Sequence, residues 1–348
     1  MKVLHVISGL RGGGAEHFVL ELCRQSLKEK EKEKDIEMNV LTLSGADEII
    51  HKFRGAGIKV FTTSDTAKQN RRLKALKGFR ILLKHPHDVV HAHMFHACMV
   101  ACFAKLFRPS LKIIFTLHNN YVPQLHRRLF LFLTQPLRKT DIIFPGMQRK
   151  WYQKKKSVVV ANGINVTRFN HLHIDKPPLF TCAFIGRLND EKNPLFLVEL
   201  AKSLLPEHNF IIRIAGDGPL KTKLNEMIAE QNLGDHFQLL GHVDDVADLL
   251  AECHCLLIPS LWEGMPLVLL EAGASGIPVI ATPVGNIPSL LNNTNGYIGN
   301  TENFRKMAIE MMDNYGEALI RARRLMQKVN DDYGIKKSYQ QHLQIYRQ

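Results

Sequence analysis

The sequence predicts an α/β protein built from two doubly wound parallel sheets, and three observations support this. Its 348 residues exceed one ordinary hydrophobic core and suit two domains of roughly 150 to 200 residues. Short runs rich in Val and Ile alternate with helical patterns along the chain, as expected for parallel strands buried on both faces. Each half also opens with an apolar strand that runs into a glycine turn and a helix.

The expected strands are short apolar runs, and helical segments lie between most of them. In the first half they span residues 2–7, 38–43, 59–61, 89–91, 112–117, 141–144 and 157–160. In the second half they span residues 179–185, 209–215, 237–239, 253–258, 278–281 and 297–298. A polar stretch that ends in two prolines, 171–178, predicts the domain boundary. The first domain is therefore expected at 1–170 and the second at 171–330.

The charge of the chain is concentrated in its first half. The net charge is +13. Residues 1–170 hold 30 Lys and Arg against 12 Asp and Glu, a net charge of +18, whereas residues 171–348 hold 16 against 21, a net charge of −5. Such asymmetry predicts an interaction surface for an anionic partner, which bulk charge leaves open as nucleic acid, an anionic membrane face or a phosphorylated ligand. With 45% hydrophobic and 23% charged residues, the composition excludes disorder and collagen-like repetition.

Targeting and redox signals favour a cytoplasmic protein. No stretch approaches about 18 consecutive apolar residues, which a membrane-spanning helix requires, and residues 1–9 are too short and polar for a signal peptide, so a buried first strand is expected. The six cysteines form no Cys-x-x-Cys pair and are expected to be reduced and buried. Cys253, His254 and Cys255 occur in a strand-like run whose side chains alternate between faces, so no shared metal is expected there.

A glycine turn follows the first strand. Residues 9–16, which include Gly12, Gly13, Gly14 and Glu16, lie between the strand and an amphipathic helix. Glycines let the backbone approach a phosphate, and a helix N-terminus offers N–H donors to it. The spacing matches neither a dinucleotide fingerprint nor a P-loop. A phosphate site and a plain tight turn are both compatible with it.

Two cations lie in the loop after the first strand of the second half. Arg187 and Lys192 follow the expected carboxyl end of a parallel strand, where open α/β sheets bind ligands. A planar guanidinium and a mobile ammonium suit a diphosphate. The alternative is that both form surface salt bridges with Asp190 and Glu191.

Two glutamates mark a further loop and helix. Glu263 lies in a loop after an expected strand, Pro266 suits the first turn of a helix, and Glu271 falls inside its apolar sequence. A carboxylate there needs partners, and the vicinal hydroxyls of a ribose would serve. If helical spacing holds throughout, the two glutamates are about 12 Å apart, the reach from a ribose to a sugar beyond its diphosphate. An N-terminal carboxylate and a buried ion pair are the alternative.

Together these pieces resemble the retaining glycosyltransferases of family 4, which have the GT-B fold, with two Rossmann-like domains that face a central cleft. The two-glutamate motif with its upstream Arg and Lys is the specific part of this resemblance. The matching pieces follow the family's order: Gly13-Gly14-Ala15-Glu16, Val90-His91-Ala92-His93, Thr116-Leu117-His118, Asn162-Gly163-Ile164, Gly186-Arg187-Leu188 with Glu191-Lys192, Ala215-Gly216-Asp217-Gly218-Pro219-Leu220, and Glu263-Gly264 with Glu271-Ala272.

The resemblance implies a donor site that lies mainly in the second domain. Arg187 and Lys192 hold the donor diphosphate and neutralise the charge that builds on it as it leaves. Glu271 accepts hydrogen bonds from the ribose, and Glu263 grips the transferred sugar. The other donor-binding positions are Gly13 and Gly14 over the diphosphate, Gly264, Met265 and Pro266 at the sugar, and the loops at Gly216 and Val243 around the nucleobase.

The acceptor side is implied to belong to the first domain. His118 is placed beside the sugar as a catalytic residue, and His91 or His93 shapes the domain wall, with His93 assigned to the acceptor side. Glu16 either caps its helix or contacts the acceptor. The final helix, residues 331–348, is expected to cross back to the first domain, as GT-B tails do.

The implied enzyme is a hexosyltransferase of cell-surface polysaccharide or lipopolysaccharide assembly. It uses a nucleotide-diphosphate sugar, with UDP-sugar as the first expectation, and a lipid-linked or oligosaccharide acceptor. No carboxylate nucleophile stands out for double displacement, so front-face substitution is expected, with no metal and no cofactor. Asn165, Asn286 and Ser289 depart from the family pattern near the donor, so donor identity does not transfer.

Two basic segments of the first half are candidates for peripheral contact with the anionic cytoplasmic membrane face. Residues 74–84 are basic and amphipathic, and residues 127–133 place two arginines beside aromatic residues. The alternative is that both helices only cover the sheet. A GT-B sugar-nucleotide epimerase or phosphorylase is the second enzymatic interpretation. A nucleic-acid-binding protein is the remote one, because no recognised module is present.

Overall fold

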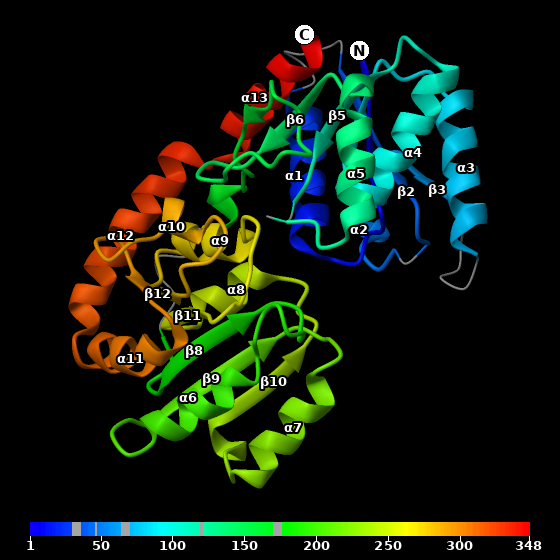
Figure 1. Cartoon of the computed structure of the whole chain (residues 1–348). Helices are drawn as coiled ribbons and strands as arrows, with labels where there is room; N and C mark the ends of the chain where they lie inside the picture. The colour runs from blue at the N-terminus through cyan, green and yellow to red at the C-terminus, as the bar shows by residue number, and fades with distance from the viewer. Residues whose placement is uncertain (30–35, 46, 64–69, 119–120, 170–175) are drawn as a thin grey trace. The chain divides into compact units, whose positions relative to one another are not determined.

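The computed structural model describes residues 1–29, 36–45, 47–63, 70–118, 121–169 and 176–348 (Figure 1). They form two compact units, Met1–Gly163 with Ile335–Gln348, and Ile164–Gly334. The chain thus enters the second unit at Ile164, ahead of the boundary predicted within 171–178. Residues 171–175 of that predicted boundary lie outside the described residues.

The first unit contains a seven-stranded sheet in the order β3-β2-β1-β4-β5-β6-β7, and every pairing is parallel. Its strands are β1 (Lys2–Ile7), β2 (Glu37–Thr42), β3 (Val60–Thr62), β4 (Val89–His93), β5 (Lys112–Thr116), β6 (Thr140–Ile143) and β7 (Val158–Val159). Its helices are α1 (Gly14–Lys28), α2 (Ile50–Gly55), α3 (Arg71–Lys84), α4 (Met94–Phe107), α5 (Leu125–Leu133), the 3₁₀ turn η1 (Gln135–Leu137) and α13 (Ile335–Arg347).

Helices cover both faces of this sheet, as predicted from strands whose sequences are apolar throughout and do not alternate between apolar and polar residues. Leu4 and Val6 of β1 pack with the cluster that includes α3, α4 and α5. On the other face α1 lies against α13 (Figure 1), and His5 of β1 contacts Tyr346 of α13. The last helix of the chain therefore belongs to the first unit.

A buried ion pair joins the end of the α5–η1 segment to β6. Both carboxylate oxygens of Asp141 accept hydrogen bonds from the Arg138 guanidinium, at 2.7 and 2.9 Å, and both side chains are fully buried. Arg138 also donates to the Leu131 carbonyl at 2.7 Å, and Asp141 accepts from the Lys154 backbone N–H at 2.8 Å. With these partners the two buried charges are compensated.

Burial also encloses a cluster of five neighbouring histidine rings in this unit: His5, His91, His93, His118 and His342. Burial lowers the pKa of all five; it lowers that of His5 and His118 to about 3 and that of His342 to about 4. Neighbouring histidine rings add to the effect for the first four residues. The native unit therefore holds these rings neutral at pH 7.

The second unit contains a six-stranded sheet in the order β10-β9-β8-β11-β12-β13, again parallel throughout. Its strands are β8 (Phe180–Ile185), β9 (Phe210–Ala215), β10 (Phe237–Gly241), β11 (Cys255–Ile258), β12 (Val279–Ala281) and β13 (Tyr297–Ile298). Its helices are η2 (Val166–Phe169), α6 (Phe196–Leu204), α7 (Lys221–Glu230), η3 (Gly234–His236), α8 (Val246–Ala251), α9 (Leu267–Ser275), α10 (Ile287–Leu290), η4 (Thr301–Asn303), α11 (Phe304–Asp313) and α12 (Tyr315–Asp332).

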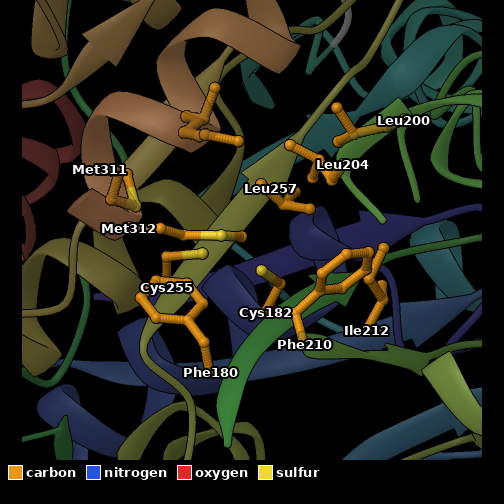
Figure 2. A pocket seen from close by; sticks show the side chains of 12 residues that line it. Phe180, Cys182, Leu200, Leu204, Phe210, Ile212, Cys255, Leu257, Met311 and Met312 are labelled. Atoms are coloured by element: carbon orange, nitrogen blue, oxygen red, sulfur yellow. The ribbon is translucent and has the colours of Figure 1, made fainter. Parts of the chain in front are cut away.

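A small apolar cavity lies inside the core of this unit (Figure 2). Side chains from β8, β9, β11, β12, α6 and α11 line it, and the only polar groups among them are cysteine thiols. It offers no convergent polar groups of the kind that orient a ligand, so it is a gap in the packing. The six cysteines of the chain are all buried and unpaired, as predicted.

The predicted strands agree closely with the observed ones. Lys2–Ile7 and Tyr297–Ile298 match residue for residue, and most of the other strands shift by one or two residues at an end. In the 253–258 run only Cys255–Ile258 is strand; Cys253 and His254 precede it. Within the described part of the chain, no helix has the length and apolarity that crossing a bilayer needs.

Removing one partner of the buried pair should destabilise the first unit strongly. We expect Asp141→Asn to cost about 3–5 kcal/mol, because the guanidinium stays buried without its counter-charge. Denaturant unfolding followed by circular dichroism measures this. The double variant Arg138→Met/Asp141→Leu is the control and should lose less. A loss below about 1 kcal/mol in Asp141→Asn would mean that water reaches the guanidinium.

Stability should also fall in mild acid. Unfolded histidines take up protons below pH about 6.5. The native rings stay neutral there, because burial lowers the pKa of His5 and His118 to about 3, that of His342 to about 4, and those of His91 and His93 well below their ordinary value. Each of the five rings therefore reduces the unfolding free energy by up to about 1.4 kcal/mol for each pH unit below 6.5. Denaturant titrations at pH 7.5, 6.0 and 5.0 test this. His342→Gln should flatten the slope, and the exposed His126→Gln should not.

Candidate functional site

The strand order of the second sheet reverses between β8 and β11, and the predicted cations and Glu263 follow these two strands. Successive strands build outward from β8 through β9 and β10 on one side, and from β11 through β12 and β13 on the other. Ligands of open α/β sheets bind outside the carboxyl ends of the strands at such a reversal. Arg187 and Lys192 lie in the loop after β8, and Glu263 lies in the loop after β11.

An ion pair joins these two loops. Lys192 Nζ donates to Glu263 Oε1 at 2.6 Å, and Ser260 Oγ donates to the same oxygen at 2.7 Å. The Glu263 side chain is 4% exposed and that of Lys192 is 22% exposed. Glu263 Oε2 has no hydrogen-bond partner among the described residues, so it remains able to accept a hydrogen bond from a ligand hydroxyl.

Residues in the loops after β11 and β12 hold the segment that carries the Glu263 carboxylate in place. Thr282 Oγ1 donates to the Ser260 carbonyl at 2.6 Å. Gly285 has φ of +58°, and a Cβ there would lie 2.1 Å from the Glu263 carbonyl oxygen. Asn286 N–H donates to the Gly264 carbonyl at 3.0 Å, while its buried Nδ2 has no partner in the described structure. The loop that carries Glu263 is therefore held by backbone contacts that only glycine permits at position 285.

The two predicted cations differ in their surroundings. Lys192 is paired with Glu263, whereas the exposed Arg187 side chain makes no hydrogen bond or ion pair with another described residue. The alternative that both cations form salt bridges with Asp190 and Glu191 is wrong, since no such ion pair is present in the described chain. Burial raises the pKa of Glu191, and the negative charge of Glu263 raises it further. The nearby positive charges of Lys192 and Arg187 lower this pKa and so reduce the net increase.

The predicted nucleobase loops meet backbone to backbone. Gly216, after β9, has φ of +145°, and a Cβ there would lie 1.9 Å from the Gly186 carbonyl oxygen. Its N–H donates to the carbonyl of Gly241, at the end of β10, at 2.6 Å. The half-buried Val243 follows two residues later. Because only a glycine fits at position 216, the backbones at the ends of β8, β9 and β10 approach one another closely.

Glu271 lies in α9 and is half-buried. The helix begins at Leu267, with Pro266 as the N-cap residue in extended conformation. Helical spacing from Glu263 to Glu271 is therefore wrong, because the segment up to Pro266 is a loop. Gly264, Met265 and Pro266 are buried and connect Glu263 to the helix.

In the first unit the sheet reverses between β1 and β4, and Gly13 and Gly14 follow β1. Gly13 is the N-cap residue of α1. A Cβ at Gly13 would lie 2.5 Å from Glu16 Oε2, so the Glu16 carboxylate folds back over the start of its own helix. This position is the one expected for a carboxylate that interacts with the helix dipole.

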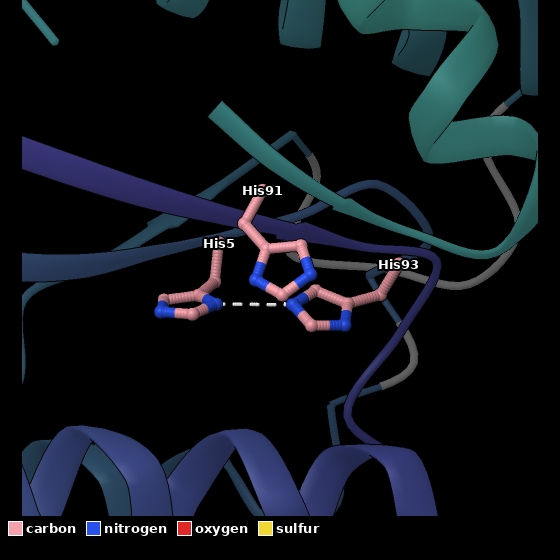
Figure 3. Close-up of side chains that lie close together, drawn as sticks. All are labelled: His5, His91 and His93. Atoms are coloured by element: carbon pink, nitrogen blue, oxygen red, sulfur yellow. Dashed lines mark hydrogen bonds between the residues drawn. The ribbon is translucent and has the colours of Figure 1, made fainter. Parts of the chain in front are cut away.

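The predicted histidines of the first unit form a row. His118 Nε2 lies 2.8 Å from His93 Nδ1. His93 Nε2 in turn lies 3.0 Å from His5 Nδ1 (Figure 3). His118 is 9% exposed, whereas His93 and His91 are fully buried. The prediction that His91 or His93 shapes the wall, with His93 on the acceptor side, therefore needs correction: His93 approaches the surface only through His118. His91 instead bonds to Tyr346 and Thr116.

Three of these rings lie close enough to be considered as metal ligands. One nitrogen each of His5, His91 and His93 lies within 4.8 Å of the other two (Figure 3). Both nitrogens of His91 and of His93 already have hydrogen-bond partners, as does Nδ1 of His5. The donor set would suit zinc, but a metal would have to break those hydrogen bonds.

Three residues that the sequence did not single out position the predicted ones. Ser260 and Thr282 support Glu263, and His5 extends the histidine row. A histidine in the middle of the buried first strand was the available signal for His5, because a polar side chain there needs partners. Nothing local in the sequence marks Ser260 or Thr282, which meet across neighbouring strands.

Family models match both halves of the chain. The model described as Glycosyltransferase Family 4 matches residues 12–168, and the model described as Glycosyl transferases group 1 matches residues 165–317. Together they cover nearly the whole chain in the order that the sequence predicts.

Relatives and solved structures agree with these models. The chain is 26% identical over 274 residues to the UDP-Gal:alpha-D-GlcNAc-diphosphoundecaprenol alpha-1,3-galactosyltransferase of Escherichia coli, which covers 70% of this chain and 68% of the relative. It is 25% identical over 286 residues to a Campylobacter jejuni enzyme named as an alpha-1,4-N-acetyl-D-galactosaminyltransferase that acts on a diphosphoundecaprenol-linked saccharide, covering 78% and 76%.

In fold, the chain resembles Anabaena HepE, whose crystal structure contains UDP and glucose. The TM-score is 0.84 at 15% identity, over 99% of both chains. This likeness confirms the predicted GT-B fold with its two Rossmann-like domains. The sequence thus belongs to the group 1, family 4-type glycosyltransferases of GT-B fold, and the protein is a transferase.

Proposed function

We propose that this protein transfers a sugar from a UDP-sugar to a lipid-linked saccharide with retention at the anomeric carbon, in the assembly of a cell-surface polysaccharide. The second unit binds the donor and the first unit receives the acceptor. The observation that carries the proposal is the arrangement of Arg187, Lys192 and Glu263 at the strand-order reversal of the second sheet. Two cations and one positioned carboxylate there match a diphosphate joined to a sugar.

Arg187, Lys192 and Glu263 have separate roles in the proposed donor site. Arg187 is exposed and without an ion pair in the described chain, so its guanidinium is available to form paired hydrogen bonds with phosphate oxygens. Lys192 is already oriented by Glu263 and adds a second positive charge beside the leaving diphosphate. Glu263 Oε2 accepts a hydrogen bond from a sugar hydroxyl, and Glu271 accepts from the ribose.

In the proposed reaction the bond between the anomeric carbon and the phosphate oxygen breaks as the acceptor oxygen attacks the same face. The acceptor proton passes to the departing phosphate oxygen. Arg187 and Lys192 stabilise the charge on the diphosphate, a task that a metal performs in other transferases, so we propose that neither metal nor cofactor is needed. Trapping of a covalent glycosyl–enzyme intermediate would rule out this single-step route.

The donor and acceptor classes rest on the relatives. The E. coli relative is named for UDP-Gal and a diphosphoundecaprenol-linked acceptor, and HepE was solved with UDP. These names support a UDP-sugar and a lipid diphosphate here. The relatives are named as transferases, which disfavours the epimerase or phosphorylase alternative.

A surface of the first unit suits an anionic membrane face. On α3 the exposed side chains include three basic residues (Lys77, Arg80 and Lys84) and three leucines (Leu73, Leu76 and Leu83). The neighbouring helices α4 and α5 add exposed apolar side chains: Phe103, Leu106, Phe107, Leu129, Phe132 and Leu133. Apolar residues flanked by cations are the pattern of an interfacial surface, so we propose peripheral association with the cytoplasmic membrane face.

Two sequence predictions about this surface change. Lys74 is buried, and its ammonium bonds to the Ser44 carbonyl, so it cannot face a membrane. In residues 129–133, Leu131 is buried and covers the sheet, whereas Leu129, Phe132 and Leu133 are exposed and available to a membrane.

Loss of the Arg187 charge should weaken donor binding without destabilising the fold. We expect Arg187→Gln to weaken binding of the UDP-sugar about 10- to 100-fold, as a lost charge-assisted hydrogen bond of about 1.5–3 kcal/mol implies. Its melting temperature without ligand should not change. Calorimetry on the donor found in a thermal-shift screen of UDP-, GDP-, ADP- and dTDP-sugars tests this. Arg323→Gln, another exposed arginine of the second unit, is the control. Equal affinity in both variants would contradict the proposed phosphate contact.

Removing the basic charges of α3 should weaken membrane binding. We expect Lys77→Gln/Arg80→Gln/Lys84→Gln to lose about 3 kcal/mol of affinity for phosphatidylglycerol vesicles, about 1 kcal/mol for each charge near the surface. Cosedimentation at low and at physiological salt measures it. The matched control neutralises Lys223, Lys306 and Arg323, three exposed cations of the second unit. Equal vesicle binding in both triple variants would place the membrane contact elsewhere.

A further inference from the structure

The histidine row of the first unit ends at a nitrogen without a partner. His118, His93 and His5 are joined ring to ring at 2.8 and 3.0 Å. At the inner end, His5 Nε2 is buried and has no hydrogen-bond partner among the described residues. At the outer end, His118 Nδ1 belongs to the one ring of the row with measurable exposure, two residues beyond the carboxyl end of β5. The row thus connects a closed interior end to the edge where ligands bind.

Counting protons leaves the row two arrangements. A neutral imidazole carries one N–H and one acceptor nitrogen. Each ring-to-ring bond needs one proton, so all N–H groups must point the same way. In one arrangement all three rings carry Nδ1–H, and His118 offers a donor outward. In the other all three carry Nε2–H, and His118 offers an acceptor outward. Any mixed arrangement leaves at least one of the two contacts with two protons or with none.

We propose that His5 and His93 are positioning residues that lock His118 in the single tautomer shared by the row, so that its outer nitrogen meets the substrate with a fixed hydrogen-bonding character. This inference rests on the proposed function for the identity of the ligand, a hydroxyl or phosphate oxygen of donor or acceptor. The two arrangements differ at the buried His5 Nε2, where the first leaves a lone pair unsatisfied and the second leaves an N–H unsatisfied. The surroundings of this atom therefore decide which arrangement forms.

The surroundings keep the row neutral. Burial lowers the pKa of His5 and of His118 to about 3, and that of His93 well below its ordinary value. Phe18 and Phe144 flank His118, and no carboxylate is bonded to any of the three rings in the described chain. An extra proton therefore has no stabilising counter-charge.

The closed inner end decides what His118 can do in a reaction. A proton taken up at His118 would have to stay there or move inward to His5, and either outcome places an imidazolium in the apolar interior. His118 is therefore unsuited to act as a general base toward the acceptor hydroxyl. Its role is to orient a substrate oxygen, which leaves the acceptor proton to the departing phosphate.

The direct test reads the tautomers by nitrogen NMR. In protein labelled with ¹⁵N-histidine at pH 7.5, long-range ¹H–¹⁵N correlations distinguish a protonated ring nitrogen from a bare one, and single His→Gln variants assign the signals. We expect His5, His93 and His118 to share one tautomer. Different tautomers within the row, an imidazolium at this pH, or one equivalent of zinc bound at these rings by metal analysis would each overturn the proposal.

A pair of variants then separates the row from general packing. His5→Phe removes the inner partner, and we expect His118 to populate both tautomers. Thr116→Val removes a hydrogen bond from His91, outside the row, and should leave the His118 tautomer unchanged. An unchanged tautomer in a folded His5→Phe protein would overturn the control by His5. If His5→Phe does not fold, the tautomers of the native protein still decide the proposal.

Activity separates this proposal from the proposed function. We expect His5→Phe to lower kcat several-fold with the donor Kd unchanged, and the pH profile of the native enzyme to show no step from His118 near neutrality. A step that vanishes in His118→Gln would show that His118 titrates during turnover and would overturn the inference. Failure of the native protein to transfer any sugar would defeat the proposed function alone, because the NMR result needs no substrate.

Discussion

The reversal of strand order in each parallel sheet is the constraint on which both candidate sites depend. At a reversal, the loops after two adjacent strands lead to opposite sides, and the strand ends between them stay uncovered. In the second unit this edge lies after β8 and β11, where Lys192 meets Glu263 at 2.6 Å. In the first unit it lies after β1 and β4, beside the glycine turn and the histidine row. Each site is therefore a consequence of topology before it is one of side-chain chemistry.

The two units use charge differently. The first unit holds 32 Lys and Arg against 12 Asp and Glu, while the second holds 14 against 21. The surplus of the first unit is spread over exposed helices such as α3, which suits a broad anionic surface. The second unit has a net negative charge, yet it places Arg187 and Lys192 at one edge. At that edge, local geometry matters more than net charge. The Glu263 carboxylate orients Lys192 and leaves the Arg187 guanidinium available to a ligand.

Buried polar groups in the first unit are held by specific hydrogen bonds, and they also make the unit sensitive to acid. The opposite charges of Arg138 and Asp141 compensate each other within one segment. The histidine rings instead form hydrogen bonds with one another, and they come from β1, β4 and the end of β5. Such a network is stable only while every ring stays neutral. The same requirement that makes the unit sensitive to acid also removes the freedom of His118 to titrate, so stability and site chemistry share one cause.

The sequence by itself determined the fold class and nearly all strand positions, because buried parallel strands and glycine turns leave local patterns. It also marked Arg187, Lys192 and Glu263 as candidate site residues in the loops after two of these strands. Tertiary structure alone decided which residues meet. The buried position of Lys74 and His93, the support of Glu263 by Ser260, and the start of α9 at Leu267 all changed an expectation. They depend on contacts between strand ends distant in sequence, and no local pattern encodes a partner that approaches from another strand.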